Sequence, residues 1–160
     1  MVKLDSVLII GIGPSTSAFF LDNLTTKIVK GLKRSKIQSE YRYLGKTIAE
    51  AREDFKQVEI KNYKAILLFL PKDSSFFEIQ VKQQNYSIPI GGGGFIPIGT
   101  VSQNFYYEGN FDVKLYKNEE KMKQIWKAYI EAGCNLARTT IYTTISNKIT
   151  SSFKKYEYIR

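Results

Sequence analysis

The chain has 160 residues, of which 43% are hydrophobic, 24% charged and 14% aromatic. These values indicate one globular domain over residues 1–160 and exclude a disordered, collagen-like or coiled-coil chain. Histidine is absent and Cys134 is the only cysteine, which excludes Ser-His and Cys-His dyads, histidine metal sites and an internal disulfide. The net charge of +9 can attract nucleic acid or anionic lipid, although it comes mainly from lysine, which recognises bases and phosphates less specifically than arginine.

No run of 18 or more apolar residues occurs, so we expect no transmembrane span. Residues 1–5 lead directly into a strand-like segment, and no signal peptide is recognisable. Two locations fit these observations: the cytoplasm, or a cell envelope reached through an export signal that has been removed.

The first 70 residues alternate between strand and helix patterns. Short apolar runs predict strands, hydrophobic residues at helical spacing predict helices, and a capping-box pattern marks Thr47–Glu50 as the start of the second helix. This order predicts a right-handed, parallel β-α-β-α-β unit. The expected elements are strands over 6–12, 37–44 and 63–70, and helices over about 16–35 and 48–58.

The pattern changes after Pro71. Apolar residues alternate with polar ones around residues 77–82, which is typical of a strand with one solvated face. Strand character returns at 101–107 and at 111–116, separated by Glu108-Gly-Asn110. We therefore expect an antiparallel second half, and the fold class is a single α/β domain with a mixed sheet and a C-terminal helix.

Residues 87–99 contain two prolines and the run Gly91–Gly94. This composition predicts a flexible loop between strands. No Lys-bearing helix follows the glycines, so they do not match a phosphate-binding loop.

Residues 122–131 fit both a helix and a strand, and we favour a strand that follows a hairpin loop at 117–121. On either periodicity Trp126 lies among apolar neighbours and should be mostly buried. Isoleucine and phenylalanine then recur at every fourth residue and predict a closing helix over about 138–155.

One turn could carry chemistry, namely Gly11-Ile-Gly13-Pro-Ser-Thr-Ser17. It follows a strand and opens a helix, so Gly13, Ser15, Thr16 and Ser17 could bind a phosphate or another small ligand. The third glycine of dinucleotide-binding turns and the Gly-Lys-Ser/Thr of P-loops are both missing. We favour the simpler interpretation, in which Ser15, Thr16 or Ser17 caps the helix.

For the other residues that could take part in catalysis or binding, we prefer a structural interpretation to a functional one. Two acidic groups could act in acid–base catalysis, but both fit solvated surface. Cys134 has no histidine to activate it and fits a small buried side chain. Four tyrosines could stack on bases but lack arginine support, so we expect them to pack on the sheet. The acidic groups are Glu50, Glu53 and Asp54, and Glu119 and Glu120; the tyrosines are Tyr41, Tyr43, Tyr106 and Tyr107.

Three segments resemble small bacterial envelope lipoproteins related to the amino-terminal domain of TolB. They are Val7–Gly11 with the turn and helix that follow, Phe111–Tyr116 paired through a turn with Ile125–Ile130, and the final amphipathic helix ending near Tyr158. Trp126 is the distinctive residue among them. The resemblance implies a periplasmic or membrane-tethered protein that acts by binding partners, and it implies no catalytic residues.

We therefore expect a non-enzymatic, cell-envelope protein that binds another protein or a component of the membrane surface. No cofactor and no metal are expected. The alternative is a small-ligand or nucleotide-binding domain that uses Gly13–Ser17. A nucleic-acid binder, suggested by charge alone, comes third.

Overall fold

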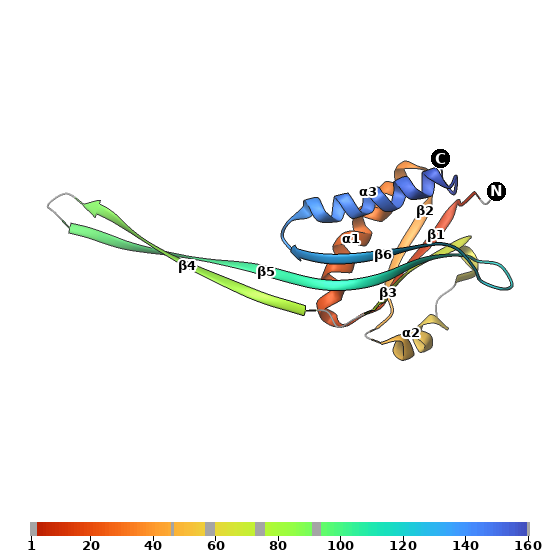
Figure 1. Ribbon diagram of the computed structural model, residues 1–160, viewed down its shortest axis with the longest axis horizontal. Helices are drawn as coiled ribbons and strands as arrows, with labels where there is room; N and C mark the ends of the chain where they lie inside the picture. Colours follow the sequence, from red (N-terminus) through yellow and green to blue (C-terminus); the bar gives the residue numbers. More distant parts are fainter. Residues whose placement is uncertain (1–2, 46, 57–59, 73–75, 91–93, 160) are drawn as a thin grey trace.

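The computed structural model describes residues 3–45, 47–56, 60–72, 76–90 and 94–159. Within them the chain forms one six-stranded sheet in the order β2-β1-β3-β5-β4, and β6 pairs with the other edge of β5 (Figure 1). The elements are β1 (Ser6–Gly11), α1 (Ser15–Arg34), β2 (Gln38–Tyr43), α2 (Ile48–Phe55), the 3₁₀ turn η1 (Ile60–Asn62), β3 (Ala65–Pro71), β4 (Phe76–Ile90), β5 (Gly94–Lys117), β6 (Lys123–Asn135) and α3 (Thr139–Lys155).

The parallel first half is confirmed. β1 pairs in parallel with β2 on one side and with β3 on the other. Every residue of β1 is buried, because helices cover both faces of this part of the sheet. The predicted capping box is also present, since the Thr47 hydroxyl accepts from the Glu50 N–H and the Glu50 carboxylate accepts from the Thr47 N–H. Val58, expected in the second helix, lies outside the described residues.

The helices divide the hydrophobic side chains into two clusters, one on each face of the sheet. α1 and α3 lie on the same side of the strands and α2 on the other (Figure 1). The larger cluster joins α1 and α3 to the sheet, and the fully buried Phe20 stacks there on Tyr107 with ring centroids 5.0 Å apart. The smaller cluster contains Ala51 of α2 together with Leu8 and Ile10 of β1.

The second half of the sheet is antiparallel, as expected, and is organised by the long strand β5. Residues 111–117 of β5 pair with β3, whereas residues 94–108 pair with β4. The opposite edge of β5 pairs with β6 from Tyr106 to Lys117. β3 and β4 therefore lie one after the other along the same edge of β5.

The predicted interruption at Glu108-Gly-Asn110 is wrong, because β5 is continuous through these residues. It marks instead the place where β5 changes its partner from β4 to β3. Gly109 is required there by close approach: a Cβ at this position would collide with the Tyr107 hydroxyl. The glycine indicates tight packing inside a strand rather than a turn.

The predicted loop over residues 87–99 is also wrong. Residues 87–90 belong to β4 and residues 94–99 to β5, and the two strands remain paired up to Ile90 and Gly94. Residues 91–93 lie outside the described part. Pro89 and Pro97 are tolerated because each lies in a strand with one free edge, where a missing N–H can face solvent.

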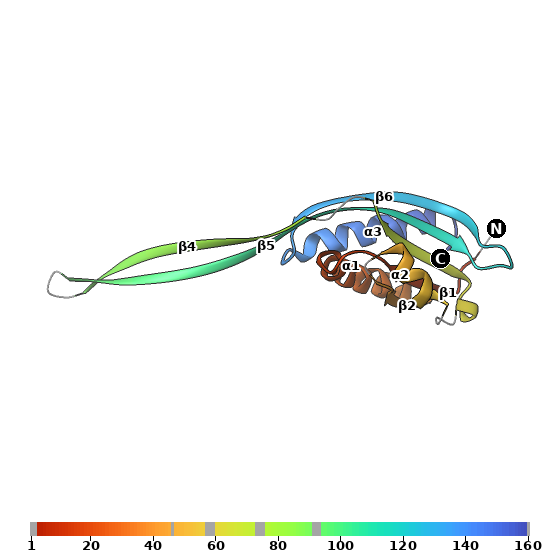
Figure 2. The same ribbon diagram turned by 90° about the horizontal axis from the view of Figure 1, so that it is seen from below.

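Beyond the end of β6 the hairpin continues as an arm, which we define as residues 79–90 of β4 and 94–105 of β5. There β5 pairs with β4 alone. The arm extends from the body on the side away from both termini (Figures 1 and 2). At the usual rise per residue, twelve-residue strands reach about 40 Å.

The remaining expectations concern the C-terminal third. Residues 122–131 lie mostly in strand β6, which confirms the favoured strand and the hairpin loop before it. The closing helix is confirmed as α3. Trp126 is partly buried, with its ring 5.0 Å from that of Phe153 and its indole N–H donating to Ser152 Oγ at 2.8 Å. No helix of the described chain is long and apolar enough to cross a membrane.

Candidate functional site

The turn after β1 is fixed by contacts within the chain. The Gly13 N–H donates to the Gly45 carbonyl at 3.1 Å, and the Gly13 carbonyl accepts from the Tyr43 hydroxyl. Gly13 has a φ of 154°, a conformation that favours glycine. The N–H of Ser17 donates to the Pro14 carbonyl at 2.8 Å. The amides of Gly13 and Ser17 are thus already occupied, which leaves this turn poorly suited to cradle a phosphate.

The expectation that a serine or threonine caps α1 is wrong. The N-cap residue is Pro14, and no side chain caps the helix. Ser17 points into the protein instead, where it is 1% exposed and its Oγ lies 2.9 Å from the Tyr107 hydroxyl. The hydroxyl of Ser17 therefore joins α1 to β5, because a buried hydroxyl needs a hydrogen-bond partner.

Ser15 and Thr16 border a hollow of about 440 Å³ at the root of the arm. The rest of its lining is apolar: Phe19, Phe105, Leu136 and Ala137. Two of these side chains are unusually open for their type, since Phe19 is 55% and Phe105 38% exposed. Large exposed apolar groups beside one another are typical of a surface that contacts another molecule. We call this surface, with Phe19 and Phe105 at its centre, the root hollow.

The sequence singled out Gly13, Ser15, Thr16 and Ser17 as one ligand site, but the structure separates them. Ser15 and Thr16 line the root hollow, whereas Ser17 is bonded to Tyr107 and Gly13 to β2 and the segment that follows it. Phe19 and Phe105 were missed. Phe19 could have been found in the sequence, because it is a large apolar residue on the otherwise polar face of the first helix. Phe105 could not, because its exposure depends on where the arm leaves the body.

The other candidates do not form a reaction centre in the described residues. Glu50 belongs to the capping box of α2, Glu53 pairs with Lys56 at 3.0 Å, and Glu119 pairs with Lys117. No group of three His, Cys, Asp or Glu residues that could hold a metal occurs in the described part. Cys134 is 8% exposed, and burial raises the pKa of its thiol, which opposes formation of a reactive thiolate.

The four tyrosines do not form a stacking surface. Tyr41 and Tyr43 lie on β2 and Tyr106 and Tyr107 on β5, with β1 and β3 between these strands. Tyr107 is fully buried, as expected for packing, and the Tyr106 hydroxyl donates to Glu108 at 3.1 Å. Consecutive bases could not stack on side chains placed so far apart.

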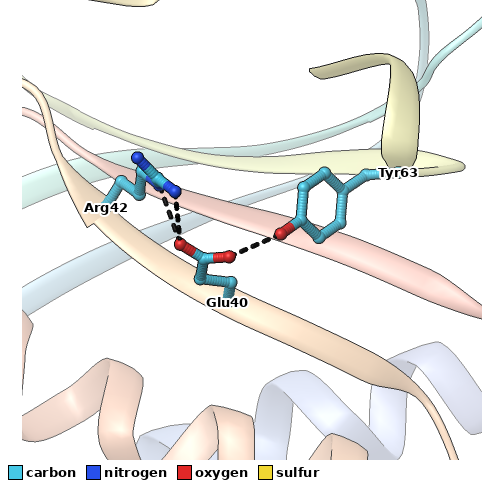
Figure 3. A network of polar contacts seen from close by, with 3 residues as sticks. All are labelled: Glu40, Arg42 and Tyr63. Atoms are coloured by element: carbon cyan, nitrogen blue, oxygen red, sulfur yellow. Dashed lines mark hydrogen bonds and ion pairs between the residues drawn. The ribbon is translucent and has the colours of Figure 1, made fainter. Parts of the chain in front are cut away.

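One exposed polar network brings a carboxylate, a guanidinium and a phenol together (Figure 3). Glu40 of β2 accepts a hydrogen bond of 2.6 Å from the Tyr63 hydroxyl and one of 2.8 Å from Arg42 Nε. The bond from Tyr63, followed by the contact with Arg42, lowers the pKa of Glu40. Glu40 is therefore ionised at neutral pH and unsuited to act as a general acid, and the network links β2 to the segment before β3.

Comparison with models of known protein families finds no match, and comparison with curated protein sequences finds no significant match.

Proposed function

We propose that this chain is a non-enzymatic binding protein of the cell envelope, which holds a protein partner through the arm and the root hollow. The observation that carries this proposal is the arm: two paired twelve-residue strands that leave the body, where the described residues show contacts from the body only at Asn104 and Phe105 at the base. The alternative use of Gly13–Ser17 for nucleotides is less well supported, since two amides of the turn are occupied and the adjoining hollow is apolar.

Energetics favour a partner on the arm. A two-stranded hairpin without a packed face is at best marginally stable in water. The described side chains of the arm contribute no buried residue, since Gln80, Gln103 and Phe105 are exposed and Asn104 is partly exposed. Within the described residues, each arm strand also has an edge without a strand partner, and such an edge readily pairs with another polypeptide. A protein bound to the arm would add contacts to those that the described residues make.

The chemistry of the body supports a binding role rather than catalysis. Several polar groups of the body take part in structural contacts, namely Ser17 with Tyr107 and Glu40 with Tyr63 and Arg42. The cell-envelope part of the proposal comes from the sequence resemblance to TolB-related lipoproteins. Fractionation of the native cells should accordingly place the protein with the periplasm or the membranes, and recovery with cytosolic markers would contradict this part.

The binding role is tested with an arm-shortened variant, in which residues 79–105 are replaced by Asn-Gly, a sequence that favours a tight hairpin turn. Partners cross-linked to the tagged chain in its native cells are identified, purified and titrated against the purified chain by calorimetry. We expect shortening to abolish binding and Phe19→Ser with Phe105→Ser to weaken it by about tenfold or more, as for central apolar contacts. Met122→Ser removes a side chain that is 43% exposed in the β5–β6 loop and serves as the control.

Melting curves must show that the body of the shortened variant remains folded. A partner that binds the shortened variant as tightly as the intact chain would contradict the proposed role of the arm. Equal losses in the Met122→Ser control would show that the effect is not specific to the root hollow.

A further inference from the structure

A groove runs along the outer edge of β6, between this strand and α3. Its first part is a hollow of about 740 Å³ between residues 124–131 of β6 and 145–156 of α3 and its C-cap. Its second part, of about 510 Å³, lies between residues 133–135 and residues 138–144, with Tyr106 of β5 also in the lining. Consecutive residues of β6 line each hollow, so the backbone edge of the strand forms part of the wall of the groove. We call these two hollows together the β6–α3 groove.

The backbone along this wall is free to pair. Within the described residues β6 pairs only with β5, although it is 13 residues long. The carbonyl of Ile125, near its start, accepts a hydrogen bond of 2.7 Å from the Tyr158 hydroxyl. From Trp126 to Cys134, the described part of the chain contains no hydrogen bond to the outer edge. Unpaired N–H and C=O groups on a long edge strand are a template for another strand.

The floor of the groove is an incompletely covered part of the hydrophobic core. Five of its side chains pack on the large hydrophobic cluster but remain partly exposed: Ile125, Trp126, Ala128, Ile141 and Ile145. The bond from Trp126 to Ser152 fixes β6 against α3 at this place. A strand laid beside β6 would cover these side chains with its own alternate residues.

The charged side chains of the groove indicate which kind of added strand would bind there. Lys127 and Lys148 line the first hollow and Arg138 the second, whereas Glu131 is the one acidic residue in the described lining. The three cations are exposed, and within the described structure none of them forms an ion pair. An occupant with acidic side chains would be attracted, and one with basic side chains would be repelled.

We propose that the β6–α3 groove binds an extended, acidic segment of a partner protein, which adds to β6 as a further strand. Main-chain hydrogen bonds to β6 would provide affinity, and apolar residues at alternate positions would enter the two hollows. This goes beyond the proposed function by adding a second contact surface, on the outer edge of β6, and it does not require the arm.

The test is a selection of random twelve-residue peptides displayed on phage against the full chain. We expect enriched peptides to alternate apolar residues with Asp or Glu. The synthetic peptides should bind the arm-shortened variant as they bind the intact chain, so that this inference and the proposed role of the arm can fail separately. The double variant Lys127→Glu with Lys148→Glu should weaken binding by about tenfold or more, and the loss of affinity should be larger at low than at high salt concentration. Lys155→Glu reverses an exposed charge on α3 outside both hollows and should leave affinity unchanged.

Amide hydrogen exchange distinguishes strand addition from adsorption to a basic surface. In the free chain every second amide of β6 should exchange rapidly, because only the amides facing β5 are bonded. Bound peptide should slow these rapid amides. Four results would overturn the inference: no enriched peptide, equal affinity for the charge-reversed variant, unchanged exchange in β6, or a dimer of the intact chain that buries β6 and thus fills the groove with a second copy.

Discussion

The buried hydrogen bond between Ser17 and Tyr107 should couple α1 to β5 energetically. Ser17 is 1% and Tyr107 0% exposed, and their oxygens lie 2.9 Å apart. Ser17→Ala leaves the buried Tyr107 hydroxyl without its hydrogen-bond partner, and Tyr107→Phe does the same to the Ser17 hydroxyl. Each change should lower the free energy of unfolding by about 1–3 kcal/mol. The double variant removes both hydroxyls, so its loss should be smaller than the sum by about 1 kcal/mol or more.

Urea unfolding followed by Trp126 fluorescence measures these losses for the wild type, the two single variants and the double variant. Ser15→Ala is the matched control, since Ser15 is exposed and on the same helical turn, and its effect should remain within about 0.5 kcal/mol. Two results would refute the inference that this buried bond couples α1 to β5. They are losses below about 0.5 kcal/mol in both single variants, or strictly additive losses in the double variant.

Three further results are expected. Thr47→Ala should lower the free energy of unfolding by about 0.5–2 kcal/mol, because it removes the cap of α2, and an unchanged urea midpoint would contradict this. Burial raises the pKa of Tyr142 to about 12, above the value near 10 of an unfolded chain, so stability should fall between pH 10 and 12 as the unfolded state loses its proton first. Tyr142→Phe should reduce this loss of stability with pH, as measured by urea unfolding at a series of pH values. An unchanged dependence of the free energy of unfolding on pH would contradict the raised pKa of Tyr142. Phosphate, ATP and NAD should not raise the melting temperature; a ligand at a hundred times its Kd would add about 2.7 kcal/mol, and such a shift, abolished by Ser15→Ala, would restore the nucleotide hypothesis.

The sequence was most informative where burial of a whole strand, or of one face of a helix, imposes a regular pattern of apolar residues. The apolar runs of β1 and β3 and the amphipathic stripes of α1 and α3 require burial wherever the chain folds, so their periodicity predicted the parallel half and the closing helix. The strand at 122–131 could be recognised because apolar residues alternate along it, although its start at Lys123 depends on pairing with β5.

The arm could not be predicted from local rules. Glycine and proline normally interrupt strands, but they are compatible with a hairpin whose two outer edges are free. Gly109 was likewise misread, because the cause of the glycine is the Tyr107 hydroxyl against it rather than a turn. The hydroxyl of Ser17 has the chemistry of a helix cap, and only the position of β5 shows that it bonds to Tyr107. Packing contacts, which residue propensities do not describe, decided all three.

Hydrogen exchange of the arm amides, in the free chain and in the complex isolated from native cells, tests the proposed partner binding most directly. Residues 79–90 and 94–105 should exchange readily in the free chain and become strongly protected in the complex, while the buried strand β1 stays protected in both. If the arm amides exchange at the same rate with and without the partner, the arm is not the surface through which this protein binds.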